Sequence, residues 1–396
     1  MSCVGRIAPF AFLAAATVHP APAGAALPRV HVDAGRPIAD GPKTPARMSI
    51  RGPGGYRGRI GIELRGSASR RFAKSSYVLE TRRRDGGARD VALLGMPREN
   101  DWILHAAHSD RTLSRDVLAY ATARWIGRWA PRTRFVELYL DRRYQGVYVL
   151  AEQVKLDRSR VAVSRAGLGG GYIVELSTAP LAGGFRSPVS GRFYGHKDPK
   201  RRQLKPAEAA WIADFVAAAE RSVAARDGGW RALVDERAAV DYLLLQELFL
   251  NYDAFSRSTF LAKGADRPLA LGPVWDFDRS MGLDLTGGRV GAQGWITPGR
   301  AWAADLLADR AFADRLVARW RELRTRGLLR VMLRALDRSR GALRGPQVRN
   351  ARRWPSTRSP SHASQMRRLR TWLVDRVRWI DTNIAALRAA DQGGTR

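Results

Sequence analysis

Apolar and polar residues alternate over short stretches throughout the first half of the chain. In one such stretch Ile60, Ile62 and Leu64 share a face, a period of two that is typical of strands with one buried side. Residues 27–57 instead mix proline, glycine and short polar runs, so we expect a loosely structured lead-in there. We predict strands at residues 59–65, 77–80, 135–140, 146–150 and 172–176, with the third and fourth forming a hairpin.

The second half of the chain has a different periodicity. Apolar residues recur there every three or four positions, as in helices that bury one face. We predict helices at residues 111–129, 207–226 and 238–251 and over almost all of 301–390, with a strand hairpin at 258–263 and 268–274. No internal repeat and no long linker interrupts this order. The pattern predicts an α+β protein with a strand-rich N-terminal half and a mostly helical C-terminal half.

The N-terminus is patterned like a secretory signal. Arg6 precedes an apolar run at 7–18, and small residues follow at 21–26 with an A-x-A-like cleavage site. We therefore predict a signal peptide at 1–26, one domain at 27–390 and a disordered tail at 391–396; the alternative for the first segment is an unstructured Ala/Pro-rich leader. No stretch holds the roughly 20 apolar residues of a membrane-spanning helix. We expect an exported protein that is not integral to the membrane.

Cysteine and charge limit the chemistry further. The one cysteine, Cys3, lies before the apolar run, so the mature chain has no disulfide and no thiol nucleophile. Lysine and arginine total 68 against 37 acidic residues, a net charge of +31. This excess could bind a polyanion at the cell surface, or it could reflect arginine used in place of lysine over the whole surface. The arginines are scattered along the chain, which favours the second interpretation. Only seven of the 68 residues are lysines, so a lysine near candidate site residues is informative.

Two acidic loops carry the most specific chemistry. Asp253 follows an apolar helix, and Asp276 and Asp278 follow a strand and a Gly-Pro pair. Bulky apolar neighbours make these carboxylates costly unless a cation, hydrogen bonds or a metal compensates them. A hairpin between the loops would bring them together, and Mg²⁺ accepts such oxygen ligands together with substrate phosphates. The alternative is that Asp276 and Asp278 cap turns and that Asp253 ends its helix.

Several short segments, in order and with matching spacing, resemble the CotH family of atypical protein kinases. They include Phe72-Ala73-Lys74-Ser75-Ser76-Tyr77 and Trp275-Asp276-Phe277-Asp278. The full set comprises residues 62–69, 72–77, 100–102, 110–115, 144–152, 171–175, 251–253 and 272–278, and the resemblance covers roughly residues 28–385. It implies a fold distantly related to protein kinases and a phosphorylation of protein side chains that depends on ATP and a divalent metal such as Mg²⁺.

The resemblance also implies roles for the acidic residues. Asp253 would be the catalytic aspartate that orients the acceptor hydroxyl. Asp276 would bind the metal, with Asp278 kept as the alternative. Ser258 departs from the usual pattern, because typical kinases place a metal-binding asparagine five residues after the catalytic aspartate. Serine is a poorer ligand, so this difference puts a second metal in doubt.

The nucleotide-binding residues are implied in the same way. Lys74 would reach the inner phosphates of ATP, with Glu152 as its carboxylate partner and Glu175 as a rival. Arg65 and the small residues after it, 66–69, could lie over the phosphates. Considered without the resemblance, Lys74 would be a surface lysine at a strand entrance. Arg65 and the two glutamates would then form structural ion pairs.

Two function classes follow from these features. The first is an exported kinase that uses ATP and Mg²⁺ to phosphorylate Ser or Thr of proteins at the cell envelope or outside the cell. The second is a secreted pseudokinase that uses its charge to bind cell-wall polyanions or a partner. Nucleic acid is not an expected partner, because most tryptophans fall at core spacing. His105 and His108 could suggest a metal pair, but without a third ligand nearby we expect structural roles for both.

Overall fold

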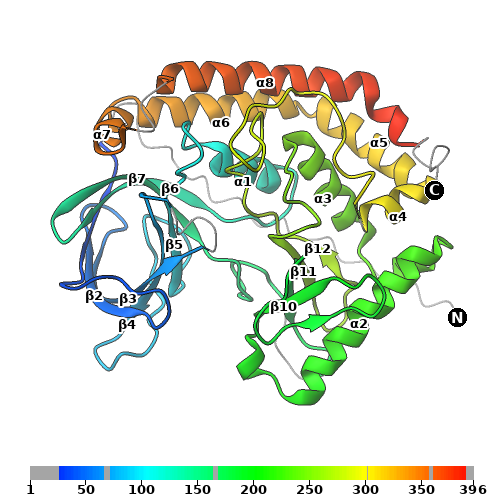
Figure 1. The fold of residues 1–396 in the computed structure, drawn as a ribbon, viewed down its shortest axis with the longest axis horizontal. Helices are drawn as coiled ribbons and strands as arrows, with labels where there is room; N and C mark the ends of the chain where they lie inside the picture. The colour runs from blue at the N-terminus through cyan, green and yellow to red at the C-terminus, as the bar shows by residue number, and fades with distance from the viewer. Residues whose placement is uncertain (1–25, 67–71, 164–167, 301, 356–359, 389–396) are drawn as a thin grey trace, which may run out of the picture.

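The computed structural model describes residues 26–66, 72–163, 168–300, 302–355 and 360–388. In Figure 1 a strand-rich lobe lies beside a lobe of helices around a second sheet, and long helices cross over both. This arrangement confirms the predicted α+β organisation. The predicted cleavage site at 23–25 and the predicted tail at 391–396 lie outside the described residues. Within those residues, none of the helices combines the length and the apolar character needed to span a bilayer.

The N-terminal lobe is a closed barrel of seven strands. Their order around the barrel is β1-β2-β3-β4-β5-β7-β6, closed by parallel pairing of β1 with β6. The lead-in expected at 27–57 was wrong, because it contains β1 and β2, and Val30 and Val32 of β1 are fully buried in the barrel core. The strands are β1 (Arg29–Asp33), β2 (Thr44–Ile50), β3 (Tyr56–Arg65), β4 (Ser76–Arg82), β5 (Asp101–His105), β6 (Thr133–Leu140) and β7 (Arg143–Glu152).

Helix α1 (Arg115–Trp125) leaves the barrel after β5 and enters the space between the lobes. It is shorter than predicted because the residues before it form a tight turn around a buried carboxylate. Asp110 accepts hydrogen bonds from the backbone N–H groups of Thr112, Ser114 and Arg115, and it pairs with the Arg115 guanidinium. Ser114 is the N-cap residue, but its side chain makes no cap hydrogen bond. Asp110 therefore fixes where α1 begins.

The second lobe surrounds a five-stranded sheet with the order β12-β11-β8-β10-β9. The predicted hairpin is confirmed as β11 paired with β12, and it joins the two acidic loops. The sheet consists of β8 (Tyr172–Ser177), β9 (Phe185–Arg186), β10 (Phe193–Asp198), β11 (Thr259–Lys263) and β12 (Ala270–Leu271). Helices α2 (Pro206–Ala225) and α3 (Glu236–Phe249) accompany it, and 12 of the 14 residues of α3 are buried. Such a helix holds the loop that follows it firmly in place.

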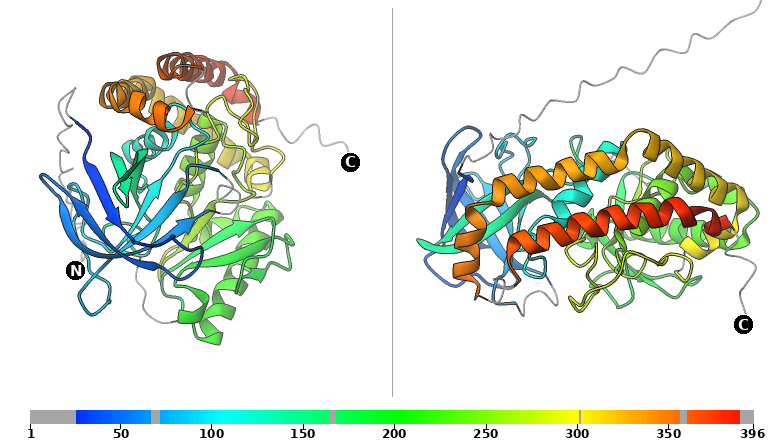
Figure 2. Two further views of the ribbon diagram at one scale, coloured as in Figure 1. Left: turned by 60° about the vertical axis from the view of Figure 1, so that its left-hand side comes forward. Right: turned by 90° about the horizontal axis from the view of Figure 1, so that it is seen from above.

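The C-terminal helices span both lobes. Seen from above in Figure 2, α6 and α8 lie side by side, and α7 turns the chain over the barrel. Asn350 of α7 accepts a hydrogen bond from the backbone N–H of Val147 at 3.0 Å, and Arg349 pairs with Glu137. These contacts fasten the helical layer to the β6–β7 hairpin. The helices are α4 (Ala303–Ala308), α5 (Arg310–Thr325), α6 (Leu328–Leu343), α7 (Pro346–Arg353) and α8 (His362–Asn383).

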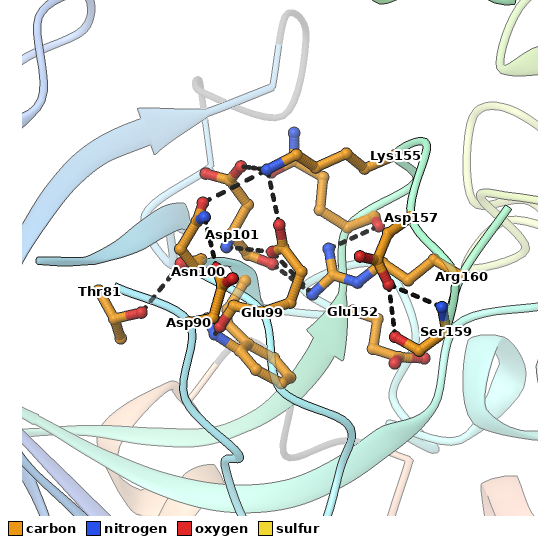
Figure 3. Close-up of polar contacts among 12 residues, drawn as sticks. Thr81, Asp90, Glu99, Asn100, Asp101, Glu152, Lys155, Asp157, Ser159 and Arg160 are labelled. Atoms are coloured by element: carbon orange, nitrogen blue, oxygen red, sulfur yellow. Dashed lines mark hydrogen bonds and ion pairs between the residues drawn. The ribbon is translucent and has the colours of Figure 1, made fainter. Parts of the chain in front are cut away.

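An ionic network fastens the connection between the lobes where the chain leaves β7 (Figure 3). Lys155 lies 2.6 Å from Glu99 and 2.7 Å from Asp101. The fully buried guanidinium of Arg160 lies 3.1 Å from Glu99 and donates to the backbone carbonyls of Gln153 and Asp101. Buried charges are stable only when they are paired and hydrogen-bonded in this way. The connection is therefore tied to the barrel rather than free to swing.

Removing the buried guanidinium should destabilise the protein. We expect Arg160→Leu to lower the free energy of unfolding by on the order of 3 kcal/mol, because Glu99 loses one of its two cationic partners and two backbone carbonyls lose a donor. The matched control is Arg158→Ala, an exposed arginine two residues away, which should change it by less than about 0.5 kcal/mol. Urea unfolding measures both values, and equal effects for the two variants would contradict this account.

Candidate functional site

The two acidic loops lie together at the ends of the β11–β12 hairpin. Asp253 comes shortly after α3, and Asp276 follows β12. The Ser258 hydroxyl of the first loop donates a hydrogen bond of 3.0 Å to the Asp276 carboxylate of the second. Both of these residues have positive φ angles, 51° for Ser258 and 65° for Asp276. Such backbone conformations are uncommon in non-glycine residues and cluster at functional sites. The predicted convergence of Asp253 with Asp276 is thus present.

A third carboxylate, Asp116 at the start of α1, joins this pair. It accepts a hydrogen bond of 2.7 Å from the backbone N–H of Phe277 and lies 3.2 Å from Nε2 of His105. The same His105 nitrogen lies 3.9 Å from Asp278. We expected a structural role for His105, but it faces the acidic cluster from the end of β5. Asp116 was missed as well, because it stands in a helical pattern, apart in sequence from the other acids.

The raised pKa values in the cluster reflect burial first and crowded negative charge second. Burial, and then the neighbouring Asp276, raise the pKa of Asp253 to about 6, against the opposing effect of Arg257. Burial and Asp276 also raise the pKa values of Asp116 and Asp278. These directions mean that the carboxylates lack sufficient positive charge around them.

Aromatic side chains pack against the cluster and keep it in place. The ring of Tyr120 stacks on Trp275 with a centroid distance of 5.7 Å, and its hydroxyl accepts a hydrogen bond from the backbone N–H of Asp276. Phe277 is fully buried against Phe249 of α3. The bulky apolar residues that flank the acids in the sequence therefore pack around them, as the sequence predicted.

Arg65 approaches the cluster from the barrel side. Its guanidinium lies 5.1 Å from the ring centroid of Trp275, and it shares a narrow pocket with His105, Asp116 and Asp276. Its positive charge adds to the burial that lowers the pKa of His105, and it opposes the burial that raises the pKa of Asp116. Arg65 is thus beside the acids, as expected, whereas the predicted covering residues 67–69 lie outside the described part of the chain.

Sequence reasoning missed a lysine whose charge interacts with Arg65 and with Glu175. Lys197 on β10 is partly exposed, and burial together with the Lys200 charge lowers its pKa to about 8. The nearby charges that act on this pKa include Glu175, which raises it, and Arg65, which lowers it. The signal was present in the sequence, because Lys197 is one of only seven lysines. It was overlooked because β10 had not been predicted as a strand.

The structure places Lys74 and Glu152 apart. Lys74 donates to the backbone carbonyl of Val147 in the middle of β7, five residues before Glu152, and five residues of strand span about 16 Å. Glu152 is fully buried and pairs with Arg132 at 2.9 Å. The predicted Lys74–Glu152 pair was therefore wrong, and a buried, fully paired Glu152 is not accessible to a nucleotide. The ion pair of Glu152 with Arg132 therefore has a structural role.

The acidic cluster fits a hard cation only in part. No group of three or more His, Cys, Asp or Glu side chains among the described residues is arranged to bind a metal by itself. Mg²⁺ sites in phosphoryl-transfer enzymes commonly use one or two carboxylates and complete their shell with phosphates and water. Oδ1 of Asp253 is buried and accepts no hydrogen bond, although Nε of Arg257 lies 3.0 Å away. Asp253, Asp276 and Asp278 thus offer the oxygen ligands that such an ion requires.

Comparison with known proteins agrees with this geometry. The profile of the family described as "CotH kinase protein" matches residues 62–380, which is most of the chain. The chain belongs to the CotH kinase family. This membership supports a protein-kinase-like role, and the acidic segments 251–253 and 272–278 lie within the matched region.

Other comparisons give little more for this CotH-family chain. No curated protein matches it. Among solved structures it is similar to a chain in the complex of the Shewanella oneidensis MR-1 toxin–antitoxin system HipA, HipB and its operator DNA, with 13% identity and a TM-score of 0.33. That match covers 83% of this chain and 66% of the other. This similarity is too low to support the fold assignment, which is based on the strands and helices described above.

The carboxylate cluster should make stability fall as the pH rises. Because the folded state raises the pKa of Asp278, it binds this proton more tightly than the unfolded chain, so stability is lost as the pH rises through the folded pKa. With a chelator present, Asp278→Asn should be more stable than the CotH-family parent at pH 8 by roughly 1 to 3 kcal/mol, and by much less at pH 5.

Chemical unfolding at both pH values measures this difference. Asp375→Asn is the control, since Asp375 is exposed on α8 away from the cluster and should show no such pH dependence. A stabilisation of Asp278→Asn that is the same at pH 5 and pH 8 would contradict the assignment.

Proposed function

We propose that the chain is an exported CotH-family kinase that transfers the terminal phosphoryl group of ATP to Ser or Thr hydroxyls of proteins. The observation that carries this proposal is the convergence of Asp253 with Asp276 and Asp278, which Arg65 approaches from the barrel. Phosphoryl transfer asks little else of a protein: positioned charges for the phosphates and an oxygen that orients the acceptor hydroxyl.

Asp253 is the residue to orient and deprotonate the acceptor. Its pKa of about 6 is close to neutral pH, where a general base is most effective. Its Oδ1 is buried beside Arg257, so the acceptor hydroxyl would approach the other oxygen of this partly exposed side chain. The guanidinium of Arg257, 3.0 Å away, opposes the rise in the pKa of Asp253.

Asp276 and Asp278 would hold Mg²⁺. When bound, this ion supplies charge neutralisation and orientation of the phosphate oxygens. Ser258 stands where typical kinases have a metal-binding asparagine, and its hydroxyl instead donates to Asp276. Ser258 would thus fix the orientation of Asp276 rather than bind a second ion.

Arg65 and Lys197 are the cations for the ATP phosphates. They reach the region from opposite lobes, Arg65 from β3 of the barrel and Lys197 from β10 of the second sheet. An arginine can bind phosphate oxygens in a bidentate manner, while a lysine acts as a point charge. This proposal gives Lys197 the role that the family resemblance had suggested for Lys74.

The proposed place of action is outside the cytoplasm, at the cell envelope or beyond. Support comes from residues 1–26, with Arg6, the apolar run and the small residues of a secretory signal. The net charge of +31 would favour acceptor proteins or cell-wall polymers with negative charge at low salt.

Loss of the catalytic aspartate should abolish transfer. We expect Asp253→Asn to lower the rate of phosphate transfer from labelled ATP–Mg²⁺ to Ser-rich acceptor peptides by about 10² to 10⁴-fold, because the acceptor hydroxyl loses its base. Asp266→Asn is the matched control: Asp266 is exposed in the turn of the same β11–β12 hairpin and should leave the rate unchanged within twofold.

Absence of transfer by the parent, with no thermal shift from ATP–Mg²⁺, would overturn the kinase proposal. Tight, salt-sensitive binding to an anionic polymer in the same experiment would then favour the second candidate, a secreted pseudokinase. Scattered exposed arginines such as Arg334, Arg338 and Arg367 are the observation that supports that alternative.

The two candidate phosphate lysines can be separated by kinetics. We expect Lys197→Met to reduce kcat/KM for ATP by about tenfold or more, because it removes a charge-assisted contact to phosphate. Lys205→Met, an exposed lysine just before α2, should not change it. Steady-state kinetics with varied ATP gives these values, and a Lys197→Met enzyme with the parental kcat/KM would contradict the role.

A further inference from the structure

A second cavity lies on the barrel side of the molecule, under α7 and the start of α8. Its volume is about 480 Å³, within the range of sites for small molecules. The residues that line it do not include the carboxylates of the acidic cluster or Arg65. The segment 105–116 separates the two places: His105 and Asp116 face the acids, whereas His108 and Arg111 face the cavity. The cavity is thus distinct from the proposed ATP site.

The floor of this cavity contains an unusual cation. Lys74 is 2% exposed, and its ammonium group donates to the carbonyls of Ala106 and Val147 and to the side-chain oxygen of Asn350. Among the described residues no carboxylate lies within ion-pair distance of it. Burial without a counter-charge lowers the pKa of Lys74 to about 7. A buried ammonium in this state is stabilised by any anion that comes near it.

The walls of the cavity add positive charge and little negative charge. Arg111, Arg352, His108 and His362 line it. Among the described residues that line it, the one carboxylate is Asp110, which pairs with Arg115 and accepts hydrogen bonds from backbone N–H groups. Nδ1 of His108 is buried and has no hydrogen-bond partner. The cavity therefore presents the guanidinium of Arg352 and the unpartnered Nδ1 of His108 on the same side as the buried Lys74.

The N-terminus of α8 also favours an anion in this cavity. Ser361 and Ala363 of its first turn line the cavity beside His362, and Ser361 is the N-cap residue. The first turn of a 22-residue helix presents backbone N–H groups and a partial positive charge, which favour phosphate and other anions. Here this feature adds to the cations of the wall and to the buried Lys74.

We propose that this cavity is a binding site for a small phosphate-bearing anion. The phosphate would lie between Arg352, the first turn of α8 and the Lys74 side of the cavity, with His108 as a further donor. The apolar side chains of Leu113 and Val348 would contact the remainder of the ligand. Arginine and helix N-termini are the groups that recognise phosphate by charge-assisted hydrogen bonds. The proposal does not depend on catalysis, because the site is separate from the acidic cluster.

Binding is tested with the full mature chain and two probes, inorganic phosphate and pyrophosphate, at constant ionic strength. We expect saturable binding by calorimetry and about tenfold weaker binding for Arg352→Glu, which reverses one wall charge. Arg353→Glu is the matched control. Its side chain is on the same exposed helix but donates to Tyr144 and Gln145 outside the cavity, so affinity should stay within twofold. Equal weakening by both variants would show diffuse surface attraction and overturn the site.

Histidine NMR signals locate the bound probe. His108 and His362 line the cavity, His105 and His196 lie elsewhere, and His31 stacks on Tyr139 in the barrel. We expect the ring signals of His108 and His362 to shift with the calorimetric affinity while the His31 signal does not move. Shifts of His105 alone would place the probe at the proposed ATP site and overturn this proposal, as would a titration in which no histidine signal moves.

Discussion

The structure depends on one electrostatic constraint: several carboxylates meet in a place with little water. Asp116 is central to it, because this single side chain receives the backbone N–H of Phe277 from the second lobe and faces His105 from the barrel. A carboxylate so placed holds the Asp276–Asp278 loop, the start of α1 and the end of β5 together. Its raised pKa shows that these contacts do not fully compensate its charge. The centre of the molecule is therefore prepared for additional positive charge.

The remaining structure keeps the two lobes at a fixed separation around that centre. The buried Arg160 and its partner Glu99 tie the connection after β7 to the barrel. On the opposite side, α7 is fastened to the β6–β7 hairpin through Asn350. Two attachments at different places resist rotation of one lobe against the other better than one would. Arg65 of the barrel and Asp276 of the second lobe can then face each other without a ligand to hold them.

Local pattern in the sequence was enough to predict most strands and helices and the two acidic loops. The β11–β12 hairpin, which joins Asp253 to Asp276, follows from short-range alternation and a turn. Features that depend on contacts between distant segments were not predictable in this way. The pairing of β1 with β6 closes the barrel across a long sequence separation, so a strand in an irregular segment such as 27–57 is visible only once its partner is known. The role of Asp116 depends equally on a contact with a residue far along the chain.

The two lysines show why residue type and motif do not settle a role by themselves. Lys74 and Lys197 are both buried enough to lose part of their affinity for a proton. Lys74 is surrounded by carbonyl oxygens and an amide, neutral groups that satisfy its hydrogens but not its charge. Lys197 instead has Glu175 close enough to raise its pKa and Arg65 close enough to lower it, so it lies in a field of both signs. A cation among opposing charges can bind a polyanion such as ATP beside a metal. A cation among neutral acceptors has no counter-charge nearby. For Lys74, an anion bound in the second cavity would supply one.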